Sequence, residues 1–425
     1  MPEYTLEQLY PPPASHTVSA WAVNDDGDAC GHALFPSGSP QGWYATLSIL
    51  WGESGITVLD TSGIDSMAWD VNSAESVVGP SPLAYPLHAF LYQNGQVQDI
   101  HPALGQPESV ACGINDAGLV VGWAGPIMEN RPFLYDSQTG EVTFVDPLPG
   151  HTKAYGHAVN VAGHVVGISS TGDNKDEHAF LYADGQATDR GAATWAQDIN
   201  ASDTIVGSKV FTGAPTSTAY RLRANDDFED LGFTSFPGYT GSHGHAINDQ
   251  DVVVGHSYGS TLPTPPPFRP FVHFPDGSAE PGLYDLQDVT TNVGAWNLEM
   301  AYDINNSGQI VGYGTLAGER RAFLLTPTRG FSPLTQLDDF AIAFIMLMGG
   351  VEAGGSGWGI LPGGGRIPID PEWWKRLSRA EKDMMLGYAV QKVSALVEDR
   401  RSREVIERAG TRVVQHAINR LERGS

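Results

Sequence analysis

Apolar and polar positions follow one pattern that recurs seven times along this chain. The block reads small–x–x–[Ile/Val]–Asn–x–x–x–x–[Val/Ile]–[Val/Ala]–Gly, and Ala29 and Cys30 fill its second apolar pair in the first copy. Its asparagines are spaced 40 to 57 residues apart, at Asn24, Asn72, Asn115, Asn160, Asn200, Asn248 and Asn305. Repetition at this period is typical of propellers and solenoids.

Each copy predicts about four short strands. The first ends at the Asn, whose side chain favours a turn because it can bond its own backbone. The β-branched pair before Gly predicts the second strand. The third begins at Leu47, His88, Arg131, His178, Thr218, Arg269 and Arg321, and a weaker fourth follows, as in VQDI and FEDLG. This arithmetic predicts an all-β, seven-bladed β-propeller of four-stranded blades.

Ring closure is the expected solution because it leaves few strand edges exposed. The segment Tyr4–Leu9 resembles a fourth strand without strands of its own before it. We therefore expect it to complete the last blade. An open β-solenoid is the alternative.

Asn turns alternate with HAF triplets, for example Gly113–Asn115, His88–Phe90 and His178–Phe180. In this respect residues 1–337 resemble the HAF-repeat family of probable extracellular repeats. The resemblance implies a repeat architecture and a secreted or surface location. The N-terminal sequence has no basic region followed by an apolar run, which predicts a cytoplasmic protein instead.

Charge divides the chain. Residues 1–337 hold 37 acidic and 11 basic residues, an excess of 26 negative charges, while residues 338–425 are nearly balanced at 12 and 13. A body this acidic should repel phosphate backbones. We therefore expect no nucleic-acid binding by the propeller.

The two cysteines do not make a disulfide framework. The longest apolar run, about 12 residues, is short of the roughly 20 that span a bilayer.

The final part of the chain lacks the repeat and predicts a small α-helical module. Residues 338–365 read as an apolar segment and a Gly-rich linker, and residues 366–425 as two amphipathic helices forming a hairpin. Its core is thin for a domain standing alone. We expect this module to dock, self-associate or bind a protein partner, with Trp373 and Trp374 as candidate anchors.

One slot of the block varies while its surroundings stay constant. Three residues before the turn Asn stand Trp21, Trp69, Cys112, His157, Gln197, His245 and Tyr302. If these side chains converge at one mouth of the channel, then Trp21, Trp69, His157, His245 and Tyr302 are candidate ligand-binding residues. If they pack between blades instead, their role is structural, filling the gaps between neighbouring sheets. Both interpretations are open from the sequence.

Two further features suggest charge chemistry. Asp70 shares a blade with His88, and Asp303 with Arg321, so we expect these to form ion pairs. The run Asn24–Asp28 is rich in carboxylates and predicts an Asx-rich hairpin turn, with a weak divalent-cation site as the alternative. No motif for another cofactor is found.

Together these features favour a non-catalytic binding or scaffold propeller with a C-terminal association module. No nucleophile elbow, metalloprotease or phosphate-loop motif is present. One alternative is a lyase or hydrolase acting on a carbohydrate or lactone, with His157 or His245 as acid or base. The other is a secreted or surface structural repeat protein.

Overall fold

The computed structural model describes most of the repeat region and two short strands beyond it. The described residues are 2–36, 44–52, 55–59, 65–81, 86–126, 128–172, 176–192, 194–210, 216–234, 238–259, 268–278, 281–328, 358–360 and 366–368. Contacts divide the chain into two units, Met1–Thr328 and Arg329–Ser425. Among the described residues, no helix is long and apolar enough to cross a membrane.

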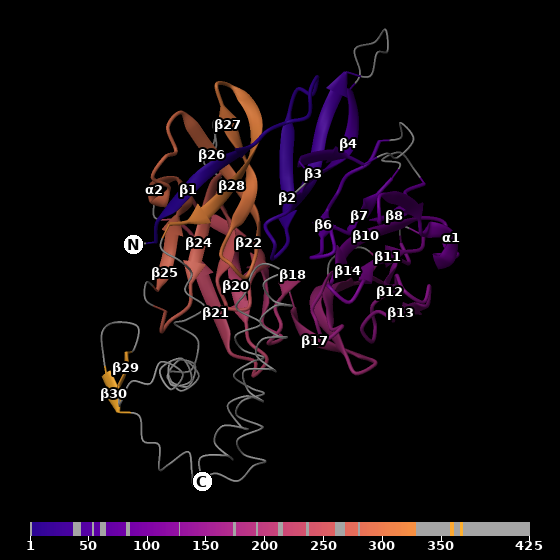
Figure 1. The fold of residues 1–425 in the computed structure, drawn as a ribbon. Helices are drawn as coiled ribbons and strands as arrows, with labels where there is room; N and C mark the ends of the chain where they lie inside the picture. The colour runs from indigo at the N-terminus through magenta and orange to yellow at the C-terminus, as the bar shows by residue number, and fades with distance from the viewer. Residues whose placement is uncertain are drawn as a thin grey trace, which may run out of the picture. The chain divides into compact units, whose positions relative to one another are not determined.

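The first unit is a ring of seven four-stranded antiparallel sheets, coloured from indigo to orange in Figure 1. Blade 1 holds β2 (Val18–Val23), β3 (Ala29–Pro36), β4 (Tyr44–Gly52) and β5 (Gly55–Val58). Blade 2 holds β6 (Asp70–Val71), β7 (Val77–Pro80), β8 (Ala89–Gln93) and β9 (Gln96–Asp99). Blade 3 holds β10 (Ser109–Ile114), β11 (Leu119–Ala124), β12 (Arg131–Asp136) and β13 (Val142–Phe144).

The next three blades repeat this order. Blade 4 holds β14 (Lys153–Val159), β15 (Val165–Ser170), β16 (Glu177–Ala183) and β17 (Gln186–Ala192). Blade 5 holds β18 (Thr194–Ile199), β19 (Ile205–Val210), β20 (Ser217–Leu222) and β21 (Phe228–Gly232). Blade 6 holds β22 (Gly241–Ile247), β23 (Val253–Tyr258), β24 (Arg269–Phe274) and β25 (Gly282–Asp285). Two one-turn helices, α1 (His101–Leu104) and α2 (Leu286–Val289), follow blades 2 and 6.

Blade 7 joins the two ends of the ring. It contains β26 (Trp296–Ile304), β27 (Ile310–Leu316) and β28 (Glu319–Pro327), and its fourth strand is the N-terminal β1 (Tyr4–Leu9). The register runs from Tyr4 opposite Pro327 to Leu9 opposite Ala322. In Figure 1 the indigo β1 lies beside the orange β28. The expected closure of the last blade by residues 4–9 is confirmed.

The repeat's core explains two of its constant positions. The third residue of each HAF-type triplet is at most 2% exposed, and these residues are Ile49, Phe90, Phe133, Phe180, Tyr220, Phe271 and Phe323. Each faces the glycine that ends the block, as Phe180 faces Gly167. A Cβ on Gly167 would lie 1.9 Å from the Tyr155 carbonyl oxygen, so only glycine fits there. The block's glycine is therefore required by close backbone approach.

In the second unit the structure describes one antiparallel pair, β29 (Trp358–Ile360) with β30 (Arg366–Pro368). This pair lies where the sequence predicts a linker and the start of a helical hairpin. The predicted helices themselves, and Trp373 and Trp374, lie outside the described residues.

Candidate functional site in the central channel

The seven Asn turns surround one mouth of the central channel. They line a cavity of about 180 Å³ to which every blade contributes the same three positions: the apolar residue before the Asn, the Asn, and the residue after it. Because each inner strand ends at this turn, the seven turns meet at a single opening.

The seven asparagines form a closed ring of hydrogen bonds. Each Nδ2 donates to the backbone carbonyl of the next blade's Asn, from Asn24 to Asn72 (3.0 Å) around to Asn305, which donates back to Asn24 (2.8 Å). Each Oδ1 accepts backbone N–H groups of its own turn. Turn chemistry explains the acceptor side, as the sequence predicts, but the donor side joins neighbouring blades.

Aspartates follow the Asn in three blades and form an acidic rim at this mouth: Asp25, Asp116 and Asp249. They also join blades, since Asp25 accepts the Asn306 N–H (2.8 Å) and Asp116 accepts the Ser73 N–H (2.8 Å). Burial raises the pKa of Asp25, hydrogen bonds from Asn306 oppose this, and repulsion by Asp116 and Asp249 adds to it. The sequence reasoning missed this rim, although the position after the Asn signals it.

Three further aspartates form hydrogen bonds between adjacent blades: Asp70, Asp198 and Asp303. Each stands two residues before the Asn and accepts an N–H from the next blade: Ile114 onto Asp70 (2.8 Å), Ile247 onto Asp198 (2.9 Å) and Val23 onto Asp303 (2.8 Å). Burial, reinforced by repulsion from Asp303, raises the pKa of Asp198 to about 7. Burial, reinforced by repulsion from Asp25, raises the pKa of Asp303 to about 6.

The expected ion pairs of Asp70 with His88 and of Asp303 with Arg321 are therefore wrong. His88 Nδ1 lies 2.9 Å from Asp99 Oδ2, and Arg321 contacts Glu319 and the His16 carbonyl. The physical reason is that a carboxylate at the inner strand lies within reach of the unpaired backbone N–H of the next blade.

The variable slot coincides with a β-bulge. The inner-strand register shifts at Trp21, Cys112, His157, Gln197, His245 and Tyr302. In blade 2 the Trp69 N–H bonds to Val78, which also pairs with Asp70. A bulge sets two residues against one and re-aims a side chain, so the extra residue is released from the regular sheet pattern.

Four of the five candidate ligand-binding residues make one row of ring contacts across blades 2, 1, 7 and 6. Trp21 stacks on Tyr302 (centroids 4.6 Å apart) and on Trp69 (6.2 Å), and Tyr302 meets His245 edge to face (5.4 Å). His157 lies outside this row, and its Nδ1 is 2.7 Å from the Ala196 carbonyl oxygen. Within the described residues, the indole nitrogens of Trp21 and Trp69 have no hydrogen-bond partner.

The pKa values of the two slot histidines, His157 and His245, are both lowered. Burial, with the nearby His243 adding to it, lowers the pKa of His245 to about 3, and its Nε2 lies 2.8 Å from His256 Nδ1. Burial also lowers the pKa of His157, against the opposing Ala196 hydrogen bond. Both imidazoles are thus uncharged near neutral pH.

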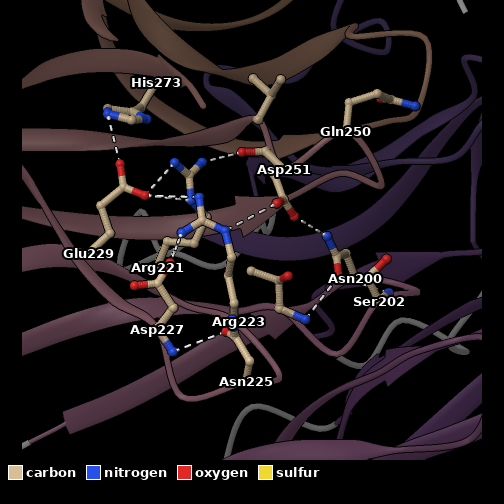
Figure 2. A network of polar contacts seen from close by, with 12 residues as sticks. Asn200, Ser202, Arg221, Arg223, Asn225, Asp227, Glu229, Gln250, Asp251 and His273 are labelled. Atoms are coloured by element: carbon tan, nitrogen blue, oxygen red, sulfur yellow. Dashed lines mark hydrogen bonds and ion pairs between the residues drawn. The ribbon is translucent and has the colours of Figure 1, made fainter. Parts of the chain in front are cut away.

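A polar network at the junction of blades 5 and 6 was not foreseen from the sequence (Figure 2). The Arg221 side chain is fully buried and donates to Glu229 Oε2 (2.7 Å) and to the Asp251 carbonyl. Arg223 donates to Glu229 Oε2 (3.1 Å). Burial raises the pKa of Glu229, but Arg221, His273 and Arg223 outweigh it and hold it below its usual value. The available signal was an arginine where other blades hold Leu or Val.

In the carboxylate-rich turn Asn24–Asp28, Asn24 bonds within the turn as well as to the next blade. Asn24 Oδ1 accepts the N–H groups of Asp26 (3.1 Å) and Asp28 (2.8 Å), and Asn24 Nδ2 donates to Asp28 Oδ2 (3.0 Å). These contacts are those of an Asx turn, the first of the two interpretations drawn from the sequence.

Comparison with known proteins shows a likeness in fold. No family model and no curated protein sequence matches the chain. The β-propeller domain of the Trilobed protease from Pyrococcus furiosus is similar at 9% identity, 74% coverage of this chain and 94% of that one, with a TM-score of 0.48. The WD40 repeats of RRP9 are similar at 10% identity, with 77% of this chain and 99% of that one covered and a TM-score of 0.44.

A puromycin-hydrolyzing peptidase from Mycobacterium tuberculosis is similar at 13% identity and a TM-score of 0.48, covering 77% of this chain. This chain spans 55% of that peptidase's length. The propeller assignment for this chain rests on its own strand order, in which seven four-stranded sheets close through β1 and β28.

Proposed function

We propose that this protein is a non-catalytic binding propeller whose acidic channel mouth receives a basic side chain of a protein partner. The observation that carries the proposal is the rim of Asp25, Asp116 and Asp249 around the cavity at the Asn turns. Complementary charge steers a partner and sets its register more than it adds affinity. The excess of 26 negative charges over residues 1–337 extends the same preference for a cationic partner.

The size of the mouth favours a side chain over a small-molecule substrate. The cavity has a volume of about 180 Å³. Pockets that enclose drug-sized ligands are typically about 300–1,000 Å³. A single lysine or arginine side chain is thus the occupant whose size and charge both agree with the site.

The lowered pKa values of His157 and His245 argue against the lyase or hydrolase alternative. A general acid or base works best with a pKa near the operating pH. The pKa of His245 is lowered to about 3, and that of His157 is lowered as well. His245 contacts His256 and His157 contacts a backbone carbonyl, so neither contact supplies the carboxylate that orients a catalytic imidazole.

Two parts of the proposal rest on sequence. Residues 366–425 would supply association with a protein partner or a second copy through amphipathic helices, with Trp373 and Trp374 as anchors. Membership of the HAF-repeat family rests on the triplets and Asn turns. Truncation after Thr328, the end of the first unit, should abolish self-association or partner capture if the C-terminal part carries it.

The mouth is tested by measuring fluorescence anisotropy of a labelled octalysine peptide with the full chain. We expect Asp25→Asn/Asp116→Asn/Asp249→Asn to weaken binding about tenfold at low salt, since exposed ion pairs contribute about 0.5 kcal/mol each. The matched control Asp184→Asn/Asp230→Asn/Asp276→Asn removes the same charge from exposed sites elsewhere. Equal weakening by the two triple variants would contradict a mouth-specific site.

A further inference from the structure

Blade 4 holds a cluster of two histidines and one aspartate away from the channel mouth. His151 lies just before β14, and Asp176 and His178 lie at the start of β16. The strand β14 has seven residues and ends at the Asn160 turn, so His151 lies roughly 20 Å from the mouth at about 3.3 Å per residue. The antiparallel register brings the start of β16 to the same end of the blade as the start of β14.

Both imidazoles turn one nitrogen toward the same carboxylate. His178 Nε2 is 3.1 Å from Asp176 Oδ1, and His151 Nε2 is 3.7 Å from Asp176 Oδ2. One ligand atom from each of the three residues lies within 4.8 Å of the others. Ligands bound at about 2.0–2.1 Å in a tetrahedral zinc site lie about 3.3 Å apart, so small side-chain movements suffice to enclose an ion.

The other nitrogen of each imidazole is already held. His178 Nδ1 lies 2.8 Å from Asp189 Oδ2, and His151 Nδ1 lies 2.9 Å from Ser169 Oγ. Ser169 is fully buried, and its Oγ also accepts the Leu148 N–H (3.0 Å). A partner at Nδ1 fixes the ring and directs the Nε2 lone pair outward, which is the arrangement found behind metal-bound histidines.

Other blades show which parts of this cluster belong to the repeat. In blade 7 the two positions of Asp176 and His178 hold Glu319 and Arg321, which form an ion pair. In blade 2 His88 contacts Asp99 as His178 contacts Asp189, and His101 lies beside it with ring centroids 3.9 Å apart. Blade 2 has Pro86 where blade 4 has Asp176. In these comparisons blade 4 alone combines both imidazoles with a bridging carboxylate.

We propose that His151, Asp176 and His178 bind a first-row divalent metal ion of the zinc or ferrous type. The two nitrogens and one carboxylate are the donors that such ions prefer, whereas calcium and magnesium prefer all-oxygen sites. The Asp176 side chain is 59% exposed, so the site opens to solvent. Three protein ligands then leave at least one position for water, as in open zinc sites.

Titration of the full chain with zinc chloride in a calorimeter tests this site after prior treatment with EDTA. We expect one site of near-unit stoichiometry that weakens at least tenfold in Asp176→Asn and in His178→Gln. Asp189→Asn, which removes the group behind His178, should weaken zinc 10- to 100-fold. His88→Gln, the matched histidine of blade 2, should stay within twofold of the wild type.

A second readout uses cobalt(II), whose intense visible absorption bands report binding in a four- or five-coordinate protein site. These bands should appear with the wild type and be lost in Asp176→Asn, whose exposed position leaves the EDTA-treated fold unchanged by circular dichroism. Wild-type titration without a stoichiometric site, or Asp176→Asn binding zinc like the wild type, would overturn the proposal. The mouth variant Asp25→Asn/Asp116→Asn/Asp249→Asn should bind zinc normally, so this proposal and the channel function fail separately.

Discussion

Blades 4 and 5 are adjacent copies of one template, yet their third strands differ at a position that is partly buried in blade 4 and fully buried in blade 5. Blade 4 has Leu181, which pairs with Thr188 on the fourth strand. Blade 5 has Arg221, fully buried, which pairs with Glu229. The difference teaches that the repeat accepts a buried cation where the fourth strand and the next blade's turn both supply partners, here Glu229 and the Asp251 carbonyl.

The largest expected effect comes from replacing one member of the Arg221–Glu229 pair of blade 5 by the residue that blade 4 has at the same position. Glu229→Thr leaves Arg221 buried without its carboxylate and should lower the free energy of unfolding by about 3–5 kcal/mol. The double variant Arg221→Leu/Glu229→Thr reproduces the Leu181 and Thr188 pair and should recover most of that loss. Urea denaturation of both variants measures this, and a double variant as unstable as Glu229→Thr would contradict it.

The next prediction concerns a position at which blades 4 and 5 do not differ. Asn160 donates to the Asn200 carbonyl (3.0 Å) and to Asp203 Oδ1 (2.8 Å), and it accepts the N–H groups of Ala162 and His164 (both 3.0 Å). Asn160→Ala should lower the free energy of unfolding by about 2–4 kcal/mol, because buried polar groups lose their partners. Its neighbour Val161 is 66% exposed.

Val161→Ala is thus the control in the same turn and should change the free energy of unfolding by at most about 0.5 kcal/mol. Chemical denaturation at constant pH compares the two. If Asn160→Ala proved as mild as Val161→Ala, the Asn ring would not be what joins the blades.

A third prediction concerns the position two residues before the turn Asn, where blade 4 has Ala158 and blade 5 has Asp198. Burial raises the pKa of Asp198 to about 7, from about 3.9 in an unfolded chain. The stability linked to its protonation is therefore complete below about pH 4 and is lost as pH rises through about 7. We expect Asp198 to add stability as pH falls from 8 to 6.5, by about 1 kcal/mol per pH unit at the lower end of that window.

The variant Asp198→Ala should show a shallower slope in that window, measured by urea denaturation at several pH values. Histidines oppose this trend at the lower end of the window: the pKa of His245 is lowered to about 3, so its contribution begins to be lost as pH falls through about 6.5 and is fully lost below about 3. Glu141→Ala, an exposed acid on blade 3, is the control and should keep the wild-type slope. An unchanged slope in Asp198→Ala would contradict the assignment.

The sequence was sufficient for the blades and the closing strand, because both depend on local patterns such as the Asn turn and the Val–Val–Gly strand. It was insufficient for contacts between blades. The Nδ2 of Asn160 and the carboxylate of Asp198 reach atoms that lie 40 to 49 residues away in the chain. Ion pairing of Asp70 with His88 followed from placing them in one blade, whereas Asp70 accepts the N–H groups of Val71 and of Ile114 in the next blade.

The candidate site was predicted only in part, because its geometry also depends on contacts between blades. The variable slot does bring Trp21, Trp69, Tyr302 and His245 into one row of ring contacts, but His157, chosen on equal grounds, lies apart. Membership of the row depends on which side chains occupy neighbouring blades. A list of slot residues does not carry that geometry until the ring is closed.

The smallest expected effect separates these two groups within the slot. Blades 1 and 7 hold Trp21 and Tyr302 in the stacked row, whereas blades 4 and 5 hold His157 and Gln197. A double-mutant cycle of Trp21→Leu with Tyr302→Leu should give a coupling energy of about 0.5–1.5 kcal/mol, the range of aromatic pairs. The cycle of Trp21→Leu with His157→Leu should be additive within about 0.5 kcal/mol, since among the described residues the ring contacts of Trp21 and the hydrogen bond of His157 involve different partners. Equal coupling in both cycles would mean that the slot acts as one unit around the ring, and the distinction between the row and blades 4 and 5 would be lost.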